Sequence, residues 1–395
     1  MKKLMLSAAA VAITAGAASA QEAVKMGVLL SFTGPIESLT PAMAAGAEMA
    51  ISEVSGDANF MGGATVEPVR ADATCVDAAA ATAAAERLVT SDGVAGIMGA
   101  DCSGVTTAVL ANVALPNGVV MISPAATSPA LSSAEDDGLF FRTAPSDARQ
   151  GEVLANILNE KGISSVAVTY TNNDYGKGFA DAFTSAFEAA GGSVTTSAAH
   201  EDGKGDYSAE VGALASAGGD ALVVLGYVDQ GGAGIIQGAL DTGAFDMFAF
   251  GDGMIGDSLT DRFGDDIAGS IGTAPGSDNE GGQTFATMAE GAGIDGTSVY
   301  AGESYDAAAL ILLAMAKAGS SNGADYKGEI LNVANAPGEP ILPGELSKAL
   351  QIIADGGDVD YVGASGVELV EPGEAAGSYA EYTVQDGALS VVGYR

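Results

Sequence analysis

Residues 24–54 read VKMGVLLSFTGPIESLTPAMAAGAEMAISEV, and this stretch decides the fold class. Its first seven residues form a nearly continuous apolar run, which is typical of a strand buried on both faces of a parallel sheet. A polar turn over residues 31–40 leads to Pro41, and proline is favoured at the first position of a helix. The pattern therefore predicts a strand over residues 24–30 and a helix over residues 42–54.

The same alternation of strand and helix continues along the chain. Further strands are predicted at residues 66–71, 94–98 and 119–122, with helices at 78–89, capped by Asp77, and 105–114. A second series has a connecting strand at residues 140–145, strands at 166–170, 194–197, 221–225 and 247–250, and helices at 148–160, 178–189, 207–215 and 231–240. Strands that alternate with helices indicate a doubly wound parallel sheet, so two such series predict two α/β lobes.

The rest of the chain is too short for a third α/β lobe. It contains two predicted helices, residues 305–318 and 344–354, and a predicted hairpin of strands 380–384 and 389–392. We therefore expect it to cross back and complete both lobes. The predicted division is residues 21–145 plus 273–375 for the N-terminal lobe, and residues 146–272 plus 376–395 for the C-terminal lobe, joined by a hinge of several strands.

The first twenty residues predict export. A basic start, Met1-Lys2-Lys3, precedes an apolar run over residues 4–18, and Ala18-Ser19-Ala20 is a small-residue cleavage site. This is the pattern of a secretory signal peptide over residues 1–20. No cysteine follows the cleavage site, so we expect a periplasmic protein without a lipid anchor.

The charge of the chain is strongly negative. The full sequence has a net charge of −36, and the chain without Lys2 and Lys3 has 13 basic and 51 acidic residues, a net charge of −38. Such a surface repels nucleic acids and anionic membranes, which excludes both as expected partners. The acidity also fits adaptation to saline surroundings, where counterions screen self-repulsion, and so indicates little about the ligand.

Few residues are available for catalysis or metal binding. Cys75 and Cys102 are the two cysteines, and an even pair in an oxidising compartment favours a disulfide. The sole histidine, His200, begins a polar stretch that we interpret as a loop. We therefore expect no enzyme activity, no metal site and no cofactor.

Four loops follow predicted strands, where open α/β sheets bind their ligands. They are residues 31–35, 99–104, 122–129 and 250–253. Ser103 is either a hydrogen-bond donor to an anion or an ordinary helix cap. Ala125 and Thr127, between two prolines, either approach a ligand closely or form a rigid turn. Asp252, between glycines, is either a ligand-binding acid or a turn aspartate bonded to its own backbone.

The sequence around these loops resembles the leucine/isoleucine/valine-binding proteins of ABC transporters, which are type I periplasmic binding proteins. The resemblance rests on Asp72-Ala73-Thr74-Cys75, on Cys102-Ser103 with the segment MISPAAT at residues 121–127, and on the segments NDYGKG at 173–178, LGY at 225–227 and GDG at 251–253. It extends in order over essentially the whole chain after residue 20. The expected fold is therefore that of a type I periplasmic binding protein.

The resemblance implies a role for each matching residue. Ser103 and Thr127 would bind the α-carboxylate of an amino acid, and the Ala125 carbonyl and Asp252 would accept from its α-ammonium. Tyr175 and Tyr227 would cover the ligand from the other lobe. Cys75 and Cys102 match the disulfide of the family.

At two positions the chain differs from the usual residues of this family, so the identity of the ligand's side chain is not determined. Asp252 is one methylene shorter than the glutamate expected at this position, and Leu39 occupies the place of a common aromatic residue. A branched-chain amino acid, another α-amino acid and a relative such as γ-aminobutyrate all remain candidates. We expect a monomer that delivers its ligand to the membrane permease of an ABC transporter; a sensor for a membrane receptor is the alternative, and an exported hydrolase is disfavoured by the lone histidine.

Overall fold

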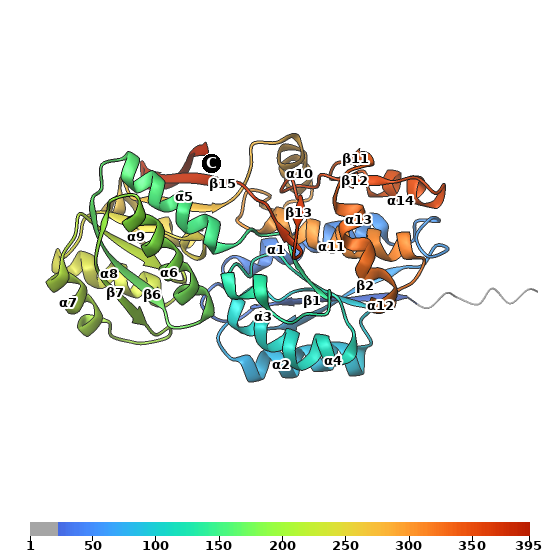
Figure 1. Cartoon of the computed structure of the whole chain (residues 1–395), viewed down its shortest axis with the longest axis horizontal. Coiled ribbons are helices and arrows are strands. Elements are labelled where there is room, and N and C mark those ends of the chain that lie inside the picture. Colours follow the sequence, from blue (N-terminus) through green and yellow to red (C-terminus); the bar gives the residue numbers. More distant parts are fainter. Residues whose placement is uncertain (1–22) are drawn as a thin grey trace, which may run out of the picture.

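Two mixed sheets organise residues 23–395, the part of the chain that the computed structural model describes. The predicted signal peptide, residues 1–20, lies outside these residues. In the described part, each of the two large sheets has seven strands, with the orders β13-β14-β5-β4-β3-β1-β2 and β16-β15-β10-β9-β8-β6-β7. Figure 1 shows the two sheets in separate lobes that lie side by side.

The first lobe is built on the sheet that contains β1. Its strands β1 to β5 are parallel, and the short hairpin β13–β14 extends the β5 edge. The strands are β1 (Val24–Leu30), β2 (Val66–Asp72), β3 (Gly96–Gly99), β4 (Met121–Ser123), β5 (Phe140–Arg142), β13 (Leu369–Val370) and β14 (Glu374–Ala375). The helices are α1 (Thr40–Val54), α2 (Ala78–Arg87), α3 (Ser103–Val109), α4 (Leu115–Asn117), α10 (Glu280–Gly291), α11 (Ala301–Ala318), α12 (Gly323–Tyr326), α13 (Ile330–Ala334) and α14 (Leu346–Ala354), beside a small sheet of β11 (Glu339–Ile341) and β12 (Val359–Tyr361).

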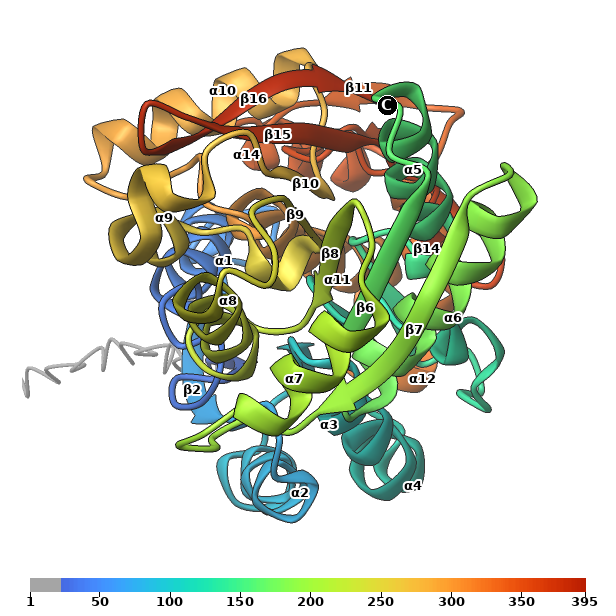
Figure 2. The ribbon, with the colours of Figure 1, turned by 90° about the vertical axis from the view of Figure 1, so that its left-hand side faces the viewer.

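The second lobe is built on the sheet that contains β6, seen from its own side in Figure 2. Strands β6 to β10 are parallel, and the C-terminal hairpin β15–β16 pairs antiparallel to β10. The strands are β6 (Ser165–Thr171), β7 (Ser193–His200), β8 (Ala221–Leu225), β9 (Phe248–Phe250), β10 (Ile271–Pro275), β15 (Tyr379–Gln385) and β16 (Ala388–Tyr394). The helices are α5 (Asp147–Glu160), α6 (Asp174–Ala189), α7 (Ser208–Ala217), α8 (Gly231–Thr242) and α9 (Asp257–Phe263).

The central strands are apolar because helices cover both of their faces. Every residue of β8 is buried, as are all but one residue of β1. The predicted cap of α2 is confirmed: the Asp77 carboxylate accepts from the backbone N–H groups of Ala79 and Ala80, each at 3.0 Å. The predicted architecture, two doubly wound α/β lobes joined by a multi-strand hinge, is confirmed.

The chain crosses between the lobes after β5, after β10 and after β14. Side chains tie these crossings together. The Thr143 hydroxyl donates to the Glu303 carbonyl at 2.8 Å, and the Tyr379 hydroxyl donates to the Ser146 carbonyl at 3.0 Å. We call this region the hinge.

Three local predictions are corrected. His200 does not lie in a polar loop: it ends β7, pairs in register with Thr171 and is buried. The helix predicted from residue 178 begins at Asp174, because the Asn173 side chain accepts from the Gly176 N–H at 3.0 Å and caps it. The helix predicted from residue 305 begins at Ala301.

In residues 23–395, no helix combines the length and apolarity that crossing a bilayer requires.

Candidate functional site

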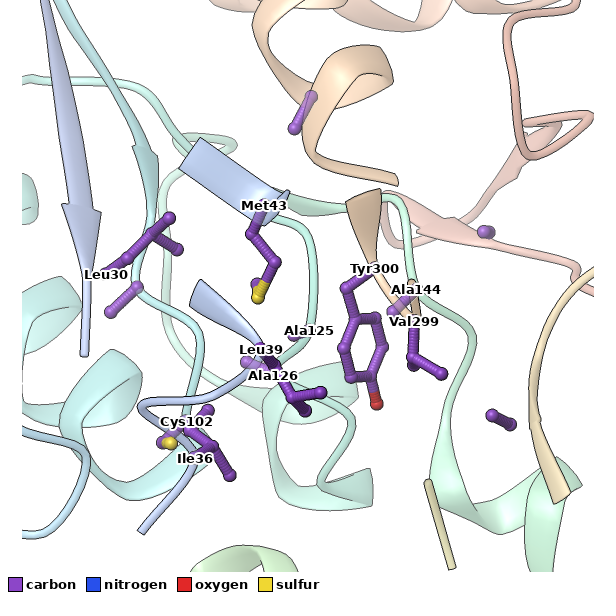
Figure 3. Close-up of a cluster of buried hydrophobic side chains, with 14 of the residues drawn as sticks. Leu30, Ile36, Leu39, Met43, Cys102, Ala125, Ala126, Ala144, Val299 and Tyr300 are labelled. Carbon is purple, nitrogen blue, oxygen red and sulfur yellow. The ribbon is translucent and has the colours of Figure 1, made fainter. Parts of the chain in front are cut away.

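A small cavity of about 20 Å³ lies between the lobes, where the carboxyl ends of strands from both sheets meet. This volume holds roughly one water molecule. Six residues named from the sequence line it: Leu39, Ser103 and Ala125 from the first lobe, and Tyr175, Tyr227 and Asp252 from the second. Figure 3 shows Leu39, Ala125 and Tyr300 converging on this region. Thr127 does not line the cavity, but it is fully buried and its hydroxyl has no hydrogen-bond partner.

The first wall is a set of loops held by their own hydrogen bonds. Ser103 is the first residue of α3, and its hydroxyl does not cap the helix but accepts from the N–H of Ser128 at 3.1 Å. The Ser123 hydroxyl accepts from the Ala126 N–H at 2.9 Å, which turns the chain at the end of β4. The buried Arg142 guanidinium donates to the carbonyls of Ala126 and Ser128 at 3.0 and 2.9 Å. These bonds fix the loop that carries Ala125 and Thr127.

The disulfide that the resemblance implied joins Cys75 to Cys102 and links the loops after β2 and β3. Next to it, the Asp101 carboxylate accepts from both the N–H and the hydroxyl of Ser31 at 2.7 Å. Three βα loops of the first lobe are therefore held together at the cavity.

The second wall centres on Asp252, which is 2 % exposed. The Tyr175 hydroxyl donates to its Oδ1 at 2.8 Å, and the Tyr300 hydroxyl donates to its Oδ2. The Tyr175 ring stacks on the Tyr227 ring with centroids 5.3 Å apart. Asp252 is thus presented by side chains and is not a turn aspartate engaged only with its own backbone.

The electrostatics of the site favour a positive ligand group. Burial raises the pKa of Asp252, and the hydrogen bonds from Tyr300 and Tyr175 oppose that rise. Burial and the nearby charge of Asp252 raise the pKa of Asp147 well above its ordinary value, and the charge of the buried Arg142, which does not line the cavity, opposes this rise. No lysine, arginine or histidine stands among the described residues that line the cavity. Two buried carboxyl groups therefore lie close together without a cationic side chain in the cavity wall.

A model of the periplasmic binding protein family matches residues 23–336. The chain belongs to the periplasmic binding protein family.

Two relatives from this family are named as amino-acid binders. The chain is 33 % identical over 234 residues to Leu/Ile/Val-binding protein homolog 3 of Brucella melitensis, and the match covers 59 % of this chain and 62 % of that protein. It is 30 % identical over 272 residues to the leucine-, isoleucine-, valine-, threonine- and alanine-binding protein of Pseudomonas aeruginosa. This match covers 69 % of this chain and 71 % of that protein. The first match spans less than two thirds of that relative.

The fold of this periplasmic binding protein also matches solved structures. A leucine-binding protein from Thermotoga maritima superposes with a TM-score of 0.78 at 24 % identity, covering 94 % of this chain and 98 % of that one. This likeness shows the fold, and the prediction of a type I periplasmic binding protein is confirmed. The relatives are binding proteins, which confirms the prediction of a binder and not an enzyme.

Sequence reasoning missed two residues of the site in this periplasmic binding protein. Tyr300 precedes α11 in a left-handed conformation, with φ of 67°, and reaches Asp252. Asp147 is fully buried at the start of α5, and neither of its carboxyl oxygens has a hydrogen-bond partner. Asp147 follows the helix cap Ser146, so in the sequence it is indistinguishable from a common first-turn acid. Tyr300 carries no local signal, because its role depends on where the hinge places it.

In residues 23–395, no group of three or more His, Cys, Asp or Glu residues is arranged to hold a metal ion.

Proposed function

We propose that the chain captures an α-amino acid between its lobes by binding both charged ends. The α-carboxylate is bound by the hydroxyl groups of Ser103 and Thr127 with nearby backbone amides. The α-ammonium is bound by Asp252 and the Ala125 carbonyl, with Asp147 next to them. Tyr175 and Tyr227 close over the ligand from the second lobe, and Leu39 borders its side chain.

The observation that carries this proposal is the buried Asp252 in a cavity wall without a cationic side chain. A buried carboxylate is stable when it is paired and hydrogen-bonded, and an ammonium group of a ligand supplies the missing charge. The unpartnered oxygens of Asp147 and Thr127 support the same assignment, since buried polar atoms are normally satisfied.

The biological context follows from the family. We propose a periplasmic monomer that delivers its ligand to the permease of an ABC transporter; the family description and the expected signal peptide support the periplasmic location. The transport energy would come from the partner subunits. Branched-chain amino acids are the first candidates, because two of the relatives are named for them.

Replacing the acid tests the assignment. In the variant Asp252→Asn, the α-amino acid that most raises the parent's Tm should bind at least roughly thirtyfold more weakly, about 2 kcal/mol, because the ammonium loses a charged partner. Isothermal calorimetry measures the affinity. The matched control, Asp257→Asn, removes an exposed carboxylate nearby and should leave the affinity unchanged. An unaltered affinity in Asp252→Asn would overturn the assigned role.

A further inference from the structure

A second cavity, of about 300 Å³, lies in the hinge and is separated from the amino-acid site by Tyr300, which lines both. We call it the hinge cavity. Its walls come from the crossing after β10, the start of α11 and the hairpin β15–β16. Its volume lies at the lower end of the range of small-molecule sites.

Glu303 is the acidic group of this cavity whose carboxylate has no partner on another described residue. The residue is 6 % exposed and lies in the first turn of α11. Among the described residues, its backbone carbonyl accepts from Thr143, but no other residue forms a hydrogen bond or ion pair with its carboxyl oxygens. Burial raises the pKa of Glu303 to about 8; a hydrogen bond from its own backbone N–H opposes this rise, and the charge of Asp306 adds to it. A buried acid without a partner on another residue stands out, because such groups are normally paired.

The remaining lining combines aromatic rings with polar groups. Phe285, Tyr300, Tyr382 and Tyr394 line the hinge cavity, and no lysine, arginine or histidine does so among the described residues. Aromatic faces attract cations, and a carboxylate binds an N–H cation by charge-assisted hydrogen bonds. A bare metal ion fits poorly, since it would require several acidic or histidine ligands.

We propose that the hinge cavity binds a small organic ammonium ion, with its N–H groups on the Glu303 carboxylate and its alkyl part against the aromatic lining. The proposal does not depend on the amino-acid site: Tyr300 lines both cavities, but Glu303 lines only the hinge cavity, and the proposal stands if the proposed transport ligand is wrong. The other titratable groups around Glu303 are Asp306 on its own helix, Asp278 before α10, and the three tyrosines of the lining.

The pH dependence of binding follows from Glu303. A protonated carboxyl cannot form the ion pair, so the cation must displace its proton below pH 8. Affinity for the cation should therefore rise about tenfold between pH 7 and pH 9, with a net release of close to one proton at pH 7. An alkylammonium probe stays charged over this range, as a lysine side chain does.

The test is a calorimetric titration of the full mature chain with n-butylammonium, in two buffers of different ionisation enthalpy. A salt concentration of about 0.3 M screens the general attraction of cations to this acidic protein. We expect saturable 1:1 binding with the proton release given above, which is measured on the parent and needs no variant. Glu303→Gln should weaken binding at least tenfold, whereas Glu290→Gln, an equal charge change at an exposed site on α10, should not.

Three outcomes would overturn the proposal. The first is the absence of saturable binding to the parent. The second is equal affinity for n-butylammonium in the parent and Glu303→Gln. The third is equal affinity of the parent for neutral n-butanol, which would make the cavity merely apolar. None of these outcomes bears on the Asp252 assignment, because Glu303 lines a different cavity.

Discussion

At the residue scale, hydroxyl groups prepare the acid of the site for its ligand. Tyr175, in the same lobe as Asp252, holds the carboxylate before the ligand arrives, and Tyr300 from residues 273–375 adds a second hydrogen bond when the lobes are closed. Preorganised donors of this kind reduce the entropy that binding must otherwise lose. Ser103 and Thr127 stand on the opposite wall, carried by loops that Arg142 and Ser123 fix. The two charged ends of a zwitterion would therefore meet two rigid, separate walls.

The sequence predicted one part of this site and not another. Ser103, Ala125 and Asp252, which line the cavity, were named because each follows a strand of a doubly wound sheet, where ligands bind; Thr127 was named on the same ground but does not line the cavity. Tyr300 and Asp147 were not found, because both lie on crossings of the hinge. Their positions depend on how the two lobes are arranged, and local sequence patterns do not predict that arrangement.

His200 makes the stability of the protein pH-dependent. Burial lowers its pKa to about 4, against an unfolded value of 6.5. Below pH 6.5 the unfolded chain binds a proton at His200, whereas the folded chain binds it only below about pH 4. The free energy of unfolding therefore falls as the pH drops from 6.5 to about 4. The loss attributable to this group amounts to about 3 kcal/mol.

This contribution is measured by urea unfolding at several pH values between 7 and 4. The variant His200→Asn lacks the titrating group, and its unfolding free energy should fall less steeply with decreasing pH than that of the parent. Identical slopes in the two proteins would show that His200 does not carry the effect.

At the scale of elements, helix packing reveals where small residues are required. A Cβ at Gly46 of α1 would lie 2.3 Å from the Ala301 carbonyl oxygen at the start of α11, so the backbones of the two helices nearly touch there. Gly212 of α7 has nothing within 4 Å of such a Cβ. The same substitution should therefore have opposite effects at the two positions.

Gly46→Ala should destabilise the protein by about 1–3 kcal/mol through overpacking, which exceeds the roughly 1 kcal/mol that alanine gains over glycine in a helix. Gly212→Ala should stabilise the protein by most of that roughly 1 kcal/mol and raise Tm slightly. Differential scanning calorimetry of both variants checks the signs. A Gly46→Ala protein as stable as the parent would contradict the close contact of α1 and α11.

Two buried strands were predicted more closely than two of the helix starts. The predicted ranges 24–30 and 221–225 match β1 and β8 residue for residue, because apolar runs bounded by polar turns mark a buried strand. The starts of α6 and α11 were placed four residues late. Asn173, whose side chain caps α6, follows the polar end of β6 and does not stand out as a helix start.

At the scale of the whole molecule, contacts between the lobes hold the cavity closed. The Asp229 carboxylate accepts from the Ser38 N–H at 2.9 Å, and the Asp229 N–H donates to the Pro35 carbonyl. Within its own lobe, the same carboxylate accepts from the Ser258 hydroxyl at 3.0 Å. A cavity of about 20 Å³ admits no amino acid in this arrangement. We therefore propose that residues 21–145 with 273–375 separate from residues 146–272 with 376–395 at the hinge to load the ligand.

Asp229→Ala should weaken this closure without touching the ligand. Loss of an exposed hydrogen bond to a charged group corresponds to about 1 kcal/mol, and the dissociation rate of a bound amino acid should rise roughly fivefold. Stopped-flow displacement measures that rate, and Asp261→Ala, at an exposed position on α9, serves as the control. An unchanged dissociation rate would exclude Asp229 from the closed-state contacts.

The interlobe cavity, as we propose, recognises both charged ends of an α-amino acid. The most direct measurement is a calorimetric panel of the α-amino acids with the purified parent, followed by the N-acetyl and the carboxamide derivatives of the tightest binder. We expect one or more amino acids to bind 1:1, and each derivative to lose at least about a hundredfold in affinity, because each lacks one charged group. Derivatives that bind as tightly as the amino acid, or a panel in which no amino acid binds, would contradict the claim.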